Sequence, residues 1–288
     1  MVIFTDTDTD FTPETAKEFG YELISMPFMI GEETIYPFKD SDSFDYKNFY
    51  DTLRNGVIPS SFALNQDVYR EIFEPYFAKG EDILYVHFSR KMTVSFDAMD
   101  KAIEELKLEY PNVKFYSIDT KGITILSYVI VKEIGKLYKN GASIEEIIEW
   151  ADKEVSKFAV YFYADNLKFF GRSGRVSGFA AFMGNLIGIK PIIHINDEGI
   201  MTNIAKEKGR KKAIDKLVSY VEELGDNIKD YTFVVGHADF MDCAEMLGGI
   251  LKEKFGEDLD IEYVIVNPTC GGHCGPDTIG VCFHAKHR

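Results

Sequence analysis

The sequence has few cysteines and no long hydrophobic segment. Its four cysteines, all between positions 243 and 282 of the 288 residues, are too few to form a disulfide framework. No apolar run approaches the roughly 18 residues that a membrane-spanning helix needs, and the first residues lack the basic segment with which a secretion signal begins. These features predict a soluble protein without a transmembrane segment, and we expect it in the cytoplasm.

Positive charge is also scarce. The 32 lysines and arginines are outnumbered by 47 aspartates and glutamates, so the formal net charge is −15. Because so little positive charge is available to offset repulsion from phosphates, this balance argues against binding to nucleic acid or to an anionic membrane surface. Hydrophobic residues are plentiful instead and make up 45% of the sequence, which is enough for a large folded core.

Short apolar segments alternate with predicted helices along the first half of the chain. The predicted strands at 82–88 and 113–118 each end in a loop with hydroxyl or acidic residues, and a helix follows. This recurrence is typical of an α/β fold with a parallel sheet and right-handed crossovers. From Phe158 the pattern changes, and a pair of strands is predicted around the turn at 196–199. We therefore predict two α/β lobes, at 1–157 and 158–288.

The segment 270–276 carries three glycines, a proline and a histidine between two strand-like runs. Glycines let backbone N–H groups approach a ligand, and a histidine among them can donate or accept a hydrogen bond near neutral pH. One alternative is a tight turn with a surface histidine. Another is a zinc site made by Cys270, His273 and Cys274, but no second pair of cysteine or histidine residues at ligand spacing completes it. We therefore predict no metal site.

Four other segments gather polar residues in loops. An acidic turn at 6–10 follows the first predicted strand, where open α/β sheets bind ligands. Two serines, Ser60 and Ser61, follow a proline; the loop 89–95 contains two serines and a threonine; and a basic, glycine-rich loop occupies 171–177. The alternative for the acids and hydroxyls is helix capping, and the alternative for the basic loop is simple solvation.

Together these segments resemble the sequence motifs of the DegV family, the fatty-acid-binding proteins that serve as the lipid-presenting subunit of bacterial fatty-acid kinase. The similar stretches, with the family motif in parentheses, are Thr5–Phe11 (T-D-S-x-x-D-L), Pro59–Phe62 (P-T-T-S), Phe88–Phe96 (L-S-S-G-L-S-G-T-Y), Phe170–Ser177 (L-K/R-K/R-G-G-R-I-S) and Gly272–Pro276 (the first part of T-H-T-G-P-G). Each motif alone is weak, but their shared order along nearly the whole chain is specific.

This chain departs from the motifs at several positions. Lys91, Val94 and Asp277 stand where the family has glycines, and Ser60 and Ser61 stand where it has threonines. Because Lys91 and Asp277 are charged, we expect them to place charge close to the site at which the headgroup of the ligand binds.

The resemblance implies the two-lobed EDD fold, with a mostly parallel N-terminal sheet flanked by helices, a C-terminal lobe with a mixed sheet, and the ligand site between the lobes. It implies that the protein binds a long-chain fatty acid without a cofactor, a metal or catalysis of its own. A separate, DAK-type fatty-acid kinase subunit would then use ATP to phosphorylate the carboxylate to an acyl phosphate, a step in bacterial phospholipid metabolism.

The resemblance also implies roles for individual residues. Hydroxyls of Ser61 and Thr93 and the imidazole of His273 would hold the carboxylate, with Ser60 and Gly272 beside them. The acyl chain would lie in a tunnel, because each methylene removed from water contributes about 0.8 kcal/mol. The expected tunnel walls are Phe62, Phe96, and Phe179 and Met183 from an uncharged helix at 178–187. Arg172 and Arg175 would contact the kinase. Plain core packing is the alternative for the tunnel residues, and an exposed basic loop is the alternative for the arginines.

Two other functions remain open at this point. Asp6 and Asp8, directly after an apolar strand, are similar to the D-x-D nucleophile motif of haloacid-dehalogenase-like phosphohydrolases, which use Mg²⁺. However, Asp10 stands two positions after the second aspartate, where that superfamily usually has a hydrophobic or hydroxyl residue. In addition, no downstream acidic pair completes a Mg²⁺ site. The other possibility is a carrier of a different amphiphile.

Overall fold

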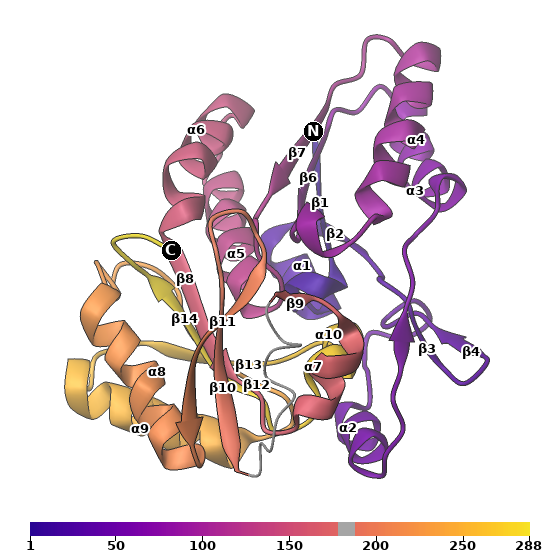
Figure 1. Cartoon of the computed structure of the whole chain (residues 1–288). Helices are drawn as coiled ribbons and strands as arrows, with labels where there is room; N and C mark the ends of the chain where they lie inside the picture. The colour runs from indigo at the N-terminus through magenta and orange to yellow at the C-terminus, as the bar shows by residue number, and fades with distance from the viewer. Residues whose placement is uncertain (178–187) are drawn as a thin grey trace.

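The computed structural model describes residues 1–177 and 188–288, which fold into two large sheets surrounded by helices (Figure 1). The first half of the chain builds a four-stranded parallel sheet in the order β2-β1-β6-β7. Its strands are β1 (Val2–Asp6), β2 (Tyr21–Ile24), β6 (Ile83–His87) and β7 (Phe115–Asp119). Every residue of β6 is buried, and its uninterrupted apolar run is typical of a central strand in a sheet covered on both faces.

Helices cover both faces of this sheet. α3 (Gln66–Ala78) and α4 (Ser95–Glu109) pack against each other on one face, where the ring of Phe4 on β1 meets that of Phe73 edge-on. α1 (Pro13–Phe19) and α5 (Ile125–Lys139) lie on the other face (Figure 1). Local signals set the helix ends. The side chain of Thr12 caps α1, and Gly20 ends it with a φ of 78°, which glycine adopts without strain.

The second half of the chain builds a seven-stranded mixed sheet in the order β13-β12-β14-β8-β10-β11-β9. Its strands are β8 (Phe158–Tyr163), β9 (Val176–Ser177), β10 (Ile189–Ile195), β11 (Met201–Lys208), β12 (Phe233–His237), β13 (Ile261–Ile265) and β14 (Ile279–His284). α8 (Arg210–Leu224) and α9 (Met241–Phe255) cover one face with a separate hydrophobic core. α5 packs against the opposite face and so lies between the two sheets, which explains why it is apolar on most sides.

Smaller elements lie where the two halves of the chain meet. An antiparallel sheet in the order β4-β3-β5 consists of β3 (Phe28–Ile30), β4 (Glu33–Ile35) and β5 (Ser60–Ser61). The remaining helices are α2 (Tyr46–Arg54), α6 (Ile144–Glu154), α7 (Leu167–Ser173) and α10 (Pro268–Cys274), with the short 3-10 turns η1 (Thr7–Thr9), η2 (Arg90–Met92) and η3 (Val155–Lys157). α10 packs against α2, β5 and α7, so it joins the first half of the chain to the second.

Arg288 also joins the two halves. Its side chain is buried and donates hydrogen bonds to four backbone carbonyl oxygens at 2.6–3.3 Å. The acceptors are the carbonyls of Thr120, Lys121, Val155 and Phe158. The loop after β7 and the start of β8 are therefore held by one guanidinium.

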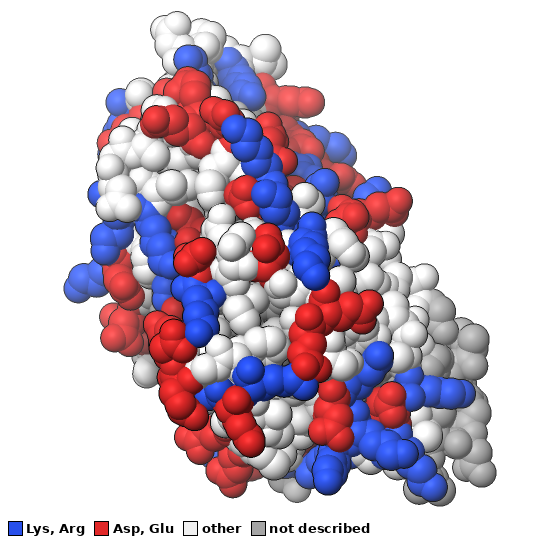
Figure 2. Space-filling view, turned by 90° about the vertical axis from the view of Figure 1, so that its left-hand side faces the viewer, with Lys and Arg blue, Asp and Glu red and all other residues white. Residues whose placement is uncertain are grey.

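Charged side chains are mixed on the surface. On the face shown in Figure 2, lysines and arginines alternate with aspartates and glutamates over the described residues, and apolar residues lie between them. Several ion pairs of the described residues join charges within one helix, such as Lys153 with Glu149 on α6. Exposed pairs of this kind contribute little to stability.

The α/β class and the combination of a parallel with a mixed sheet confirm the prediction. The segment 270–276 was wrongly predicted as a loop. Most of it belongs to α10, because the side chain of Asn267 caps the first turn and Pro268 occupies the first helical position. The sheet around β3 was also not predicted as a unit. The helix predicted at 178–187 lies outside the described residues, and the division into lobes at residue 158 stays a prediction.

Candidate functional site

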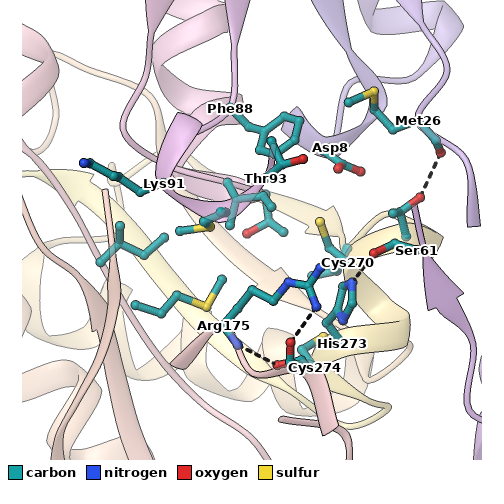
Figure 3. A pocket seen from close by; sticks show the side chains of 18 of the residues that line it. Asp8, Met26, Ser61, Phe88, Lys91, Thr93, Arg175, Cys270, His273 and Cys274 are labelled. Carbon is teal, nitrogen blue, oxygen red and sulfur yellow. Dashed lines mark hydrogen bonds between the residues drawn. The ribbon is translucent and has the colours of Figure 1, made fainter. Parts of the chain in front are cut away.

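A cavity of about 540 Å³ lies among residues from both halves of the chain. The turns after β1 and β6 form one side of it, and residues of β8, β12, β14 and α10 form the other (Figure 3). The carboxyl ends of parallel strands, where these turns lie, are the usual ligand site of open α/β sheets. Its volume falls within the range of roughly 300–1,000 Å³ that is typical of small-molecule sites.

Ser61 and His273 meet at one end of this cavity. The hydroxyl oxygen of Ser61 on β5 lies 2.7 Å from Nε2 of His273 on α10, and both side chains are partly exposed to the cavity (Figure 3). Burial, and to a lesser degree the positive charge of Arg175, lowers the pKa of His273 to about 4. The imidazole is therefore neutral at physiological pH, with one nitrogen that donates a hydrogen bond and one that accepts.

The position of His273 depends on how α10 is anchored. Oδ1 of Asp10 accepts hydrogen bonds from the backbone and the side chain of Asn267, the residue that caps α10. A Cβ on Gly271 would lie 2.5 Å from the hydroxyl of Tyr50, and a Cβ on Gly272 would lie 3.2 Å from Pro59. The two glycines thus allow α10 to pack closely against α2 and the start of β5, which brings His273 next to Ser61.

Thr93 adds a second hydroxyl to the cavity wall. It follows η2, and its Oγ1 accepts a hydrogen bond from the backbone N–H of Ser95 at 3.1 Å. This bond fixes the side chain at the start of α4 and leaves the hydroxyl hydrogen available for another acceptor. Thr93 lines the same cavity as Ser61 and His273.

Apolar residues make up most of the remaining wall. They come from α5, the mixed sheet and neighbouring loops, and include Ile123, Ile125, Val160, Phe162, Ile195, Met201 and Val266. Gly236 and Gly280 face each other on β12 and β14. A Cβ on Gly236 would lie 2.5 Å from Ile125, and a Cβ on Gly280 would lie 2.7 Å from Phe162. The glycine pair therefore lets the side chain of Ile125 lie directly on the sheet, at the wall of the cavity.

The three aspartates of the first turn have different environments. Asp6 is fully buried and accepts hydrogen bonds from the hydroxyl of Tyr85 and from the backbone N–H of Asp8. Burial, with the nearby Asp8, raises the pKa of Asp6 well above its usual value. Asp10 anchors α10, as described above. Asp8 is the one of the three that lines the cavity.

Comparison with known proteins places the chain in a family. The sequence model described as "Uncharacterised protein, DegV family" matches residues 1–286. The chain belongs to the DegV family. A DegV domain-containing protein of Clostridium perfringens is 32% identical over 284 residues, which covers 98% of this chain and 97% of that protein.

Solved DegV structures share the whole fold. A stearic-acid-binding protein of Eubacterium ventriosum matches with a TM-score of 0.86 at 18% identity, over 99% of both chains. A DegV lipid-binding protein of Thermotoga maritima matches with a TM-score of 0.82 at 22% identity, over 100% of this chain and 99% of that one. At these identities the similarity shows the fold, and this chain therefore has the DegV fold.

Some residues expected at the DegV ligand site lie elsewhere. Ser60 is exposed on β5 and is absent from the described cavity wall, because successive strand residues point to opposite faces. Gly272 packs on Pro59 and is not one of the described residues that line the cavity. Phe96, expected in the tunnel wall, is buried in the core with its ring centroid 4.1 Å from that of His87.

Other expected residues have mixed positions. Phe62 lines the cavity with 40% of its surface exposed, at the edge that faces solvent. Arg175, expected to contact a partner, also lines the cavity and lies beside His273 (Figure 3). Arg172 is exposed on α7. Phe179 and Met183 lie outside the described residues.

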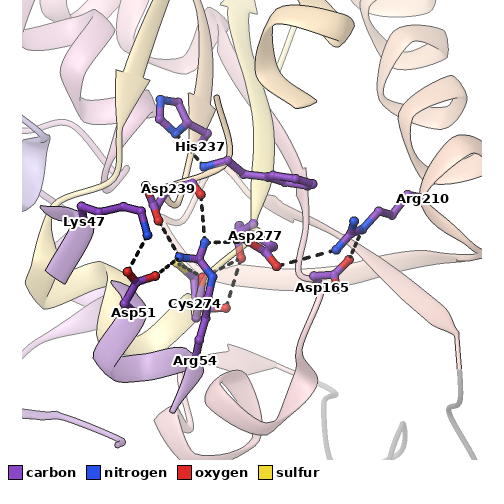
Figure 4. A network of polar contacts seen from close by, with 12 residues as sticks. Lys47, Asp51, Arg54, Asp165, Arg210, His237, Asp239, Cys274 and Asp277 are labelled. Carbon is purple, nitrogen blue, oxygen red and sulfur yellow. Dashed lines mark hydrogen bonds and ion pairs between the residues drawn. The ribbon is translucent and has the colours of Figure 1, made fainter. Parts of the chain in front are cut away.

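The two charged departures from the family motifs are separated in space. Lys91 is exposed on the cavity wall, across the cavity from Ser61 and His273 (Figure 3). Asp277 does not line the described cavity, contrary to expectation. It lies in a network of ion pairs outside it, 2.8 Å from Arg54 and 3.7 Å from Arg210 (Figure 4). Arg54 also pairs with Asp239, so this network links α2 to loops of the mixed sheet.

Neither a candidate metal site nor a candidate membrane-spanning helix is found among the described residues. They contain no group of three Cys, His, Asp or Glu side chains arranged to hold a metal ion. None of the described helices has the length and apolar character needed to cross a membrane.

Proposed function

We propose that this DegV protein binds a long-chain fatty acid, with the carboxylate at Ser61, Thr93 and His273 and the acyl chain along the apolar wall. One observation carries the proposal: a mostly apolar cavity has the hydroxyls of Ser61 and Thr93 and the neutral imidazole of His273 on its wall. The related structures from Eubacterium ventriosum and Thermotoga maritima, which are of stearic-acid-binding and lipid-binding proteins, support it.

The energetics suit such a ligand. Burial of each methylene contributes about 0.8 kcal/mol, so a long acyl chain contributes roughly ten kcal/mol before the costs of association and ordering reduce it. Burying a carboxylate without hydrogen bonds in the same cavity would cost more free energy than the acyl chain contributes. The hydroxyls of Ser61 and Thr93 supply hydrogen bonds that a carboxylate needs. When Nε2–H of His273 donates to the Ser61 oxygen, the hydroxyl hydrogen of Ser61 is free for the ligand.

We further propose that the bound carboxylate is presented to a separate, ATP-dependent fatty-acid kinase, which forms the acyl phosphate. The motif resemblance supports this step. In addition, Phe62, which follows Ser61 in the chain and also lines the cavity, is 40% exposed, so the headgroup would lie near the mouth of the cavity, within reach of a phosphoryl donor. Ser61, Thr93 and His273 are neutral groups, which leave a carboxylate oxygen free to attack. Arg175 lies beside His273, and one nitrogen of its guanidinium donates to the backbone carbonyl of Ser173. Arg172, exposed on α7, is our candidate contact with the acidic surface of a partner.

In this proposal the protein itself has no catalytic residue and no cofactor, and it acts in the cytoplasm. The phosphohydrolase alternative requires Asp6 to attack a phosphate. Asp6 has no exposed surface, its carboxylate oxygens already accept two hydrogen bonds, and its raised pKa favours the protonated, non-nucleophilic form. Magnesium-dependent hydrolysis of p-nitrophenyl phosphate, abolished in Asp6→Asn, would restore this alternative.

Mass spectrometry of the lipid extracted from the purified protein tests the proposed ligand. We expect a fatty acid in a ratio near one per chain, and exchange for an added isotope-labelled fatty acid. A different amphiphile at that ratio would identify the protein as another kind of carrier. No amphiphile, together with no thermal stabilisation by added fatty acids, would refute the proposal. Acyl-phosphate formation with a fatty-acid kinase and ATP, measured with and without this protein, tests the second step separately.

A further inference from the structure

Asp8 has a carboxyl group that the protein leaves incompletely bonded. The backbone of Asp8 is fixed, since its N–H donates to Asp6 and its carbonyl accepts a hydrogen bond from the N–H of Thr124 at 2.8 Å. The side chain points into the cavity, with only 6% of the residue exposed. Its Oδ1 has no hydrogen-bond partner among the described residues. A buried carboxylate oxygen without a partner is costly, which favours the protonated carboxyl, and the part of the side chain that lines the cavity is where a ligand would meet it.

Asp8 lies at the same end of the cavity as the headgroup residues. Its carboxyl lies against the thiol of Cys270 on α10. Cys270 is three positions before His273 on that helix, and residues at this spacing are neighbours on a helix surface. His273 in turn contacts Ser61. Figure 3 shows Asp8, Cys270, Ser61 and His273 together on one side of the cavity, with Lys91 on the other.

No lysine or arginine is in direct contact with Asp8 among the described residues, although Arg90, Lys91 and Arg175 line other parts of the same cavity. The titratable groups that face it are Asp6 and Asp10 from its own turn, Tyr85 on β6, Tyr69 on α3 and Cys270 on α10. No ion pair joins Asp8 to a lysine or arginine in the described part of the chain. Burial, with a further contribution from Asp10, raises the pKa of Asp8 to about 7, and a hydrogen bond with Cys270 opposes this shift.

We propose that Asp8 is a ligand-contacting residue that, in its protonated form, donates a hydrogen bond to the acidic headgroup, so that the cavity takes up a proton together with an anionic ligand. This inference rests on the proposed function. The DegV motif T-D-S-x-x-D-L leaves the position of Asp8 unspecified, so the role belongs to this chain rather than to the motif.

The physical reason is that two carboxylates in one cavity cannot both remain ionised at low cost. When the ligand carboxylate enters, Asp8 must hold a proton, which it either already has or takes from solvent. Below about pH 6 Asp8 of the free protein is already protonated, so ligand binding takes up no proton. Above about pH 7 free Asp8 is mostly ionised, so each further pH unit weakens binding about tenfold. His273 does not titrate in this range, because its pKa is lowered to about 4. Burial raises the pKa of Asp10 to about 7 as well, so the comparison with Asp8→Asn is what assigns the proton.

Calorimetry with the unmutated protein tests this directly. The probe is dodecanoate below its aggregation concentration, titrated at about pH 6 and about pH 8 in pairs of buffers with different ionisation enthalpies, which gives the protons taken up per ligand. We expect uptake close to one proton at the higher pH and close to none at the lower. Dodecane-1-sulfonate, which stays ionised throughout, should show the same uptake, because the proton enters the protein and not the probe.

Two variants assign the proton. Asp8→Asn keeps a permanent N–H donor, so we expect binding that is independent of pH in this range and takes up no proton. Asp152→Asn, on the exposed surface of α6, should behave as the unmutated protein does. Binding without proton uptake, or uptake that persists in Asp8→Asn, would overturn this inference and leave the proposed function intact. No binding of dodecanoate or of longer fatty acids at either pH would instead overturn the proposed function.

Discussion

Replacement of Ser61 by alanine tests the headgroup end of the cavity. The Ser61 hydroxyl lies 2.7 Å from Nε2 of His273, and in the proposed complex it donates a hydrogen bond to the ligand carboxylate. Alanine removes that donor and leaves the buried carboxylate with one bond fewer, which costs about 1–3 kcal/mol. This corresponds to a dissociation constant about 5- to 150-fold higher.

Ser60 provides a matched control in the same two-residue strand. It is exposed and points to the opposite face of β5, so Ser60→Ala should change the binding free energy by less than about 0.5 kcal/mol. Both dissociation constants can be measured by displacement of a fluorescent fatty acid at one pH and ionic strength. Thermal unfolding of both variants checks that each is folded. Equal affinity in the two variants, with both folded, would refute the assignment of Ser61 to the carboxylate.

Three further predictions concern stability and are measured by urea unfolding. Asp8 has a pKa of about 7 in the folded protein against a usual value of 3.8; its contribution to the free energy of unfolding is therefore lost as pH rises through 7. Between about pH 6 and pH 8 the unmutated protein should lose about 1 kcal/mol more than Asp8→Asn, and equal losses would show that Asp8 is not titrating there. Gly236→Ala places a Cβ 2.5 Å from Ile125 and should destabilise the protein by about 1–3 kcal/mol. The control Gly249→Ala, in open space on α9, should be neutral or stabilising by up to about 1 kcal/mol. Similar effects of the two substitutions would mean that the sheet adapts to the extra Cβ. Arg288→Met leaves four carbonyls without their donor and should cost about 2–4 kcal/mol, against almost nothing for the exposed Lys211→Met; a small loss would show that water replaces the guanidinium.

The sequence predicted those features that depend on local patterns. β6 and β7 are each determined by a few adjacent residues, and the strands predicted at 82–88 and 113–118 match them to within two residues. Ser61, Thr93 and His273 were located through motifs at strand ends, and the structure brings all three to one cavity. The expectation that they bind a headgroup stays a prediction.

Features that depend on packing between distant segments could not be predicted. Ser60 and Ser61 are adjacent serines, and only the pairing of β5 with β3 decides which of them faces the cavity. Phe96 and Ile125 are both buried, apolar helix residues, yet only Ile125 of the two lines the described cavity, because Gly236 and Gly280 on β12 and β14 make room for its side chain. Asp6 and Asp8 look alike in sequence, and the hydroxyl of Tyr85, 79 residues away, distinguishes them.

The four carbonyl contacts of Arg288 have a consequence for how the molecule responds to its surroundings. Burial lowers the pKa of this guanidinium only to about 10, so it keeps its charge under any condition a living cell imposes. Its acceptors are uncharged backbone carbonyls, three of them in the buried residues Thr120, Val155 and Phe158, and dissolved ions hardly weaken such bonds. The contacts that Arg288 makes with the loop after β7 and the start of β8 are thus insensitive to pH and salt, whereas the acidic turn after β1 is sensitive to pH. A change of pH should therefore alter ligand binding through the turn after β1, whereas the contacts of Arg288 stay unchanged.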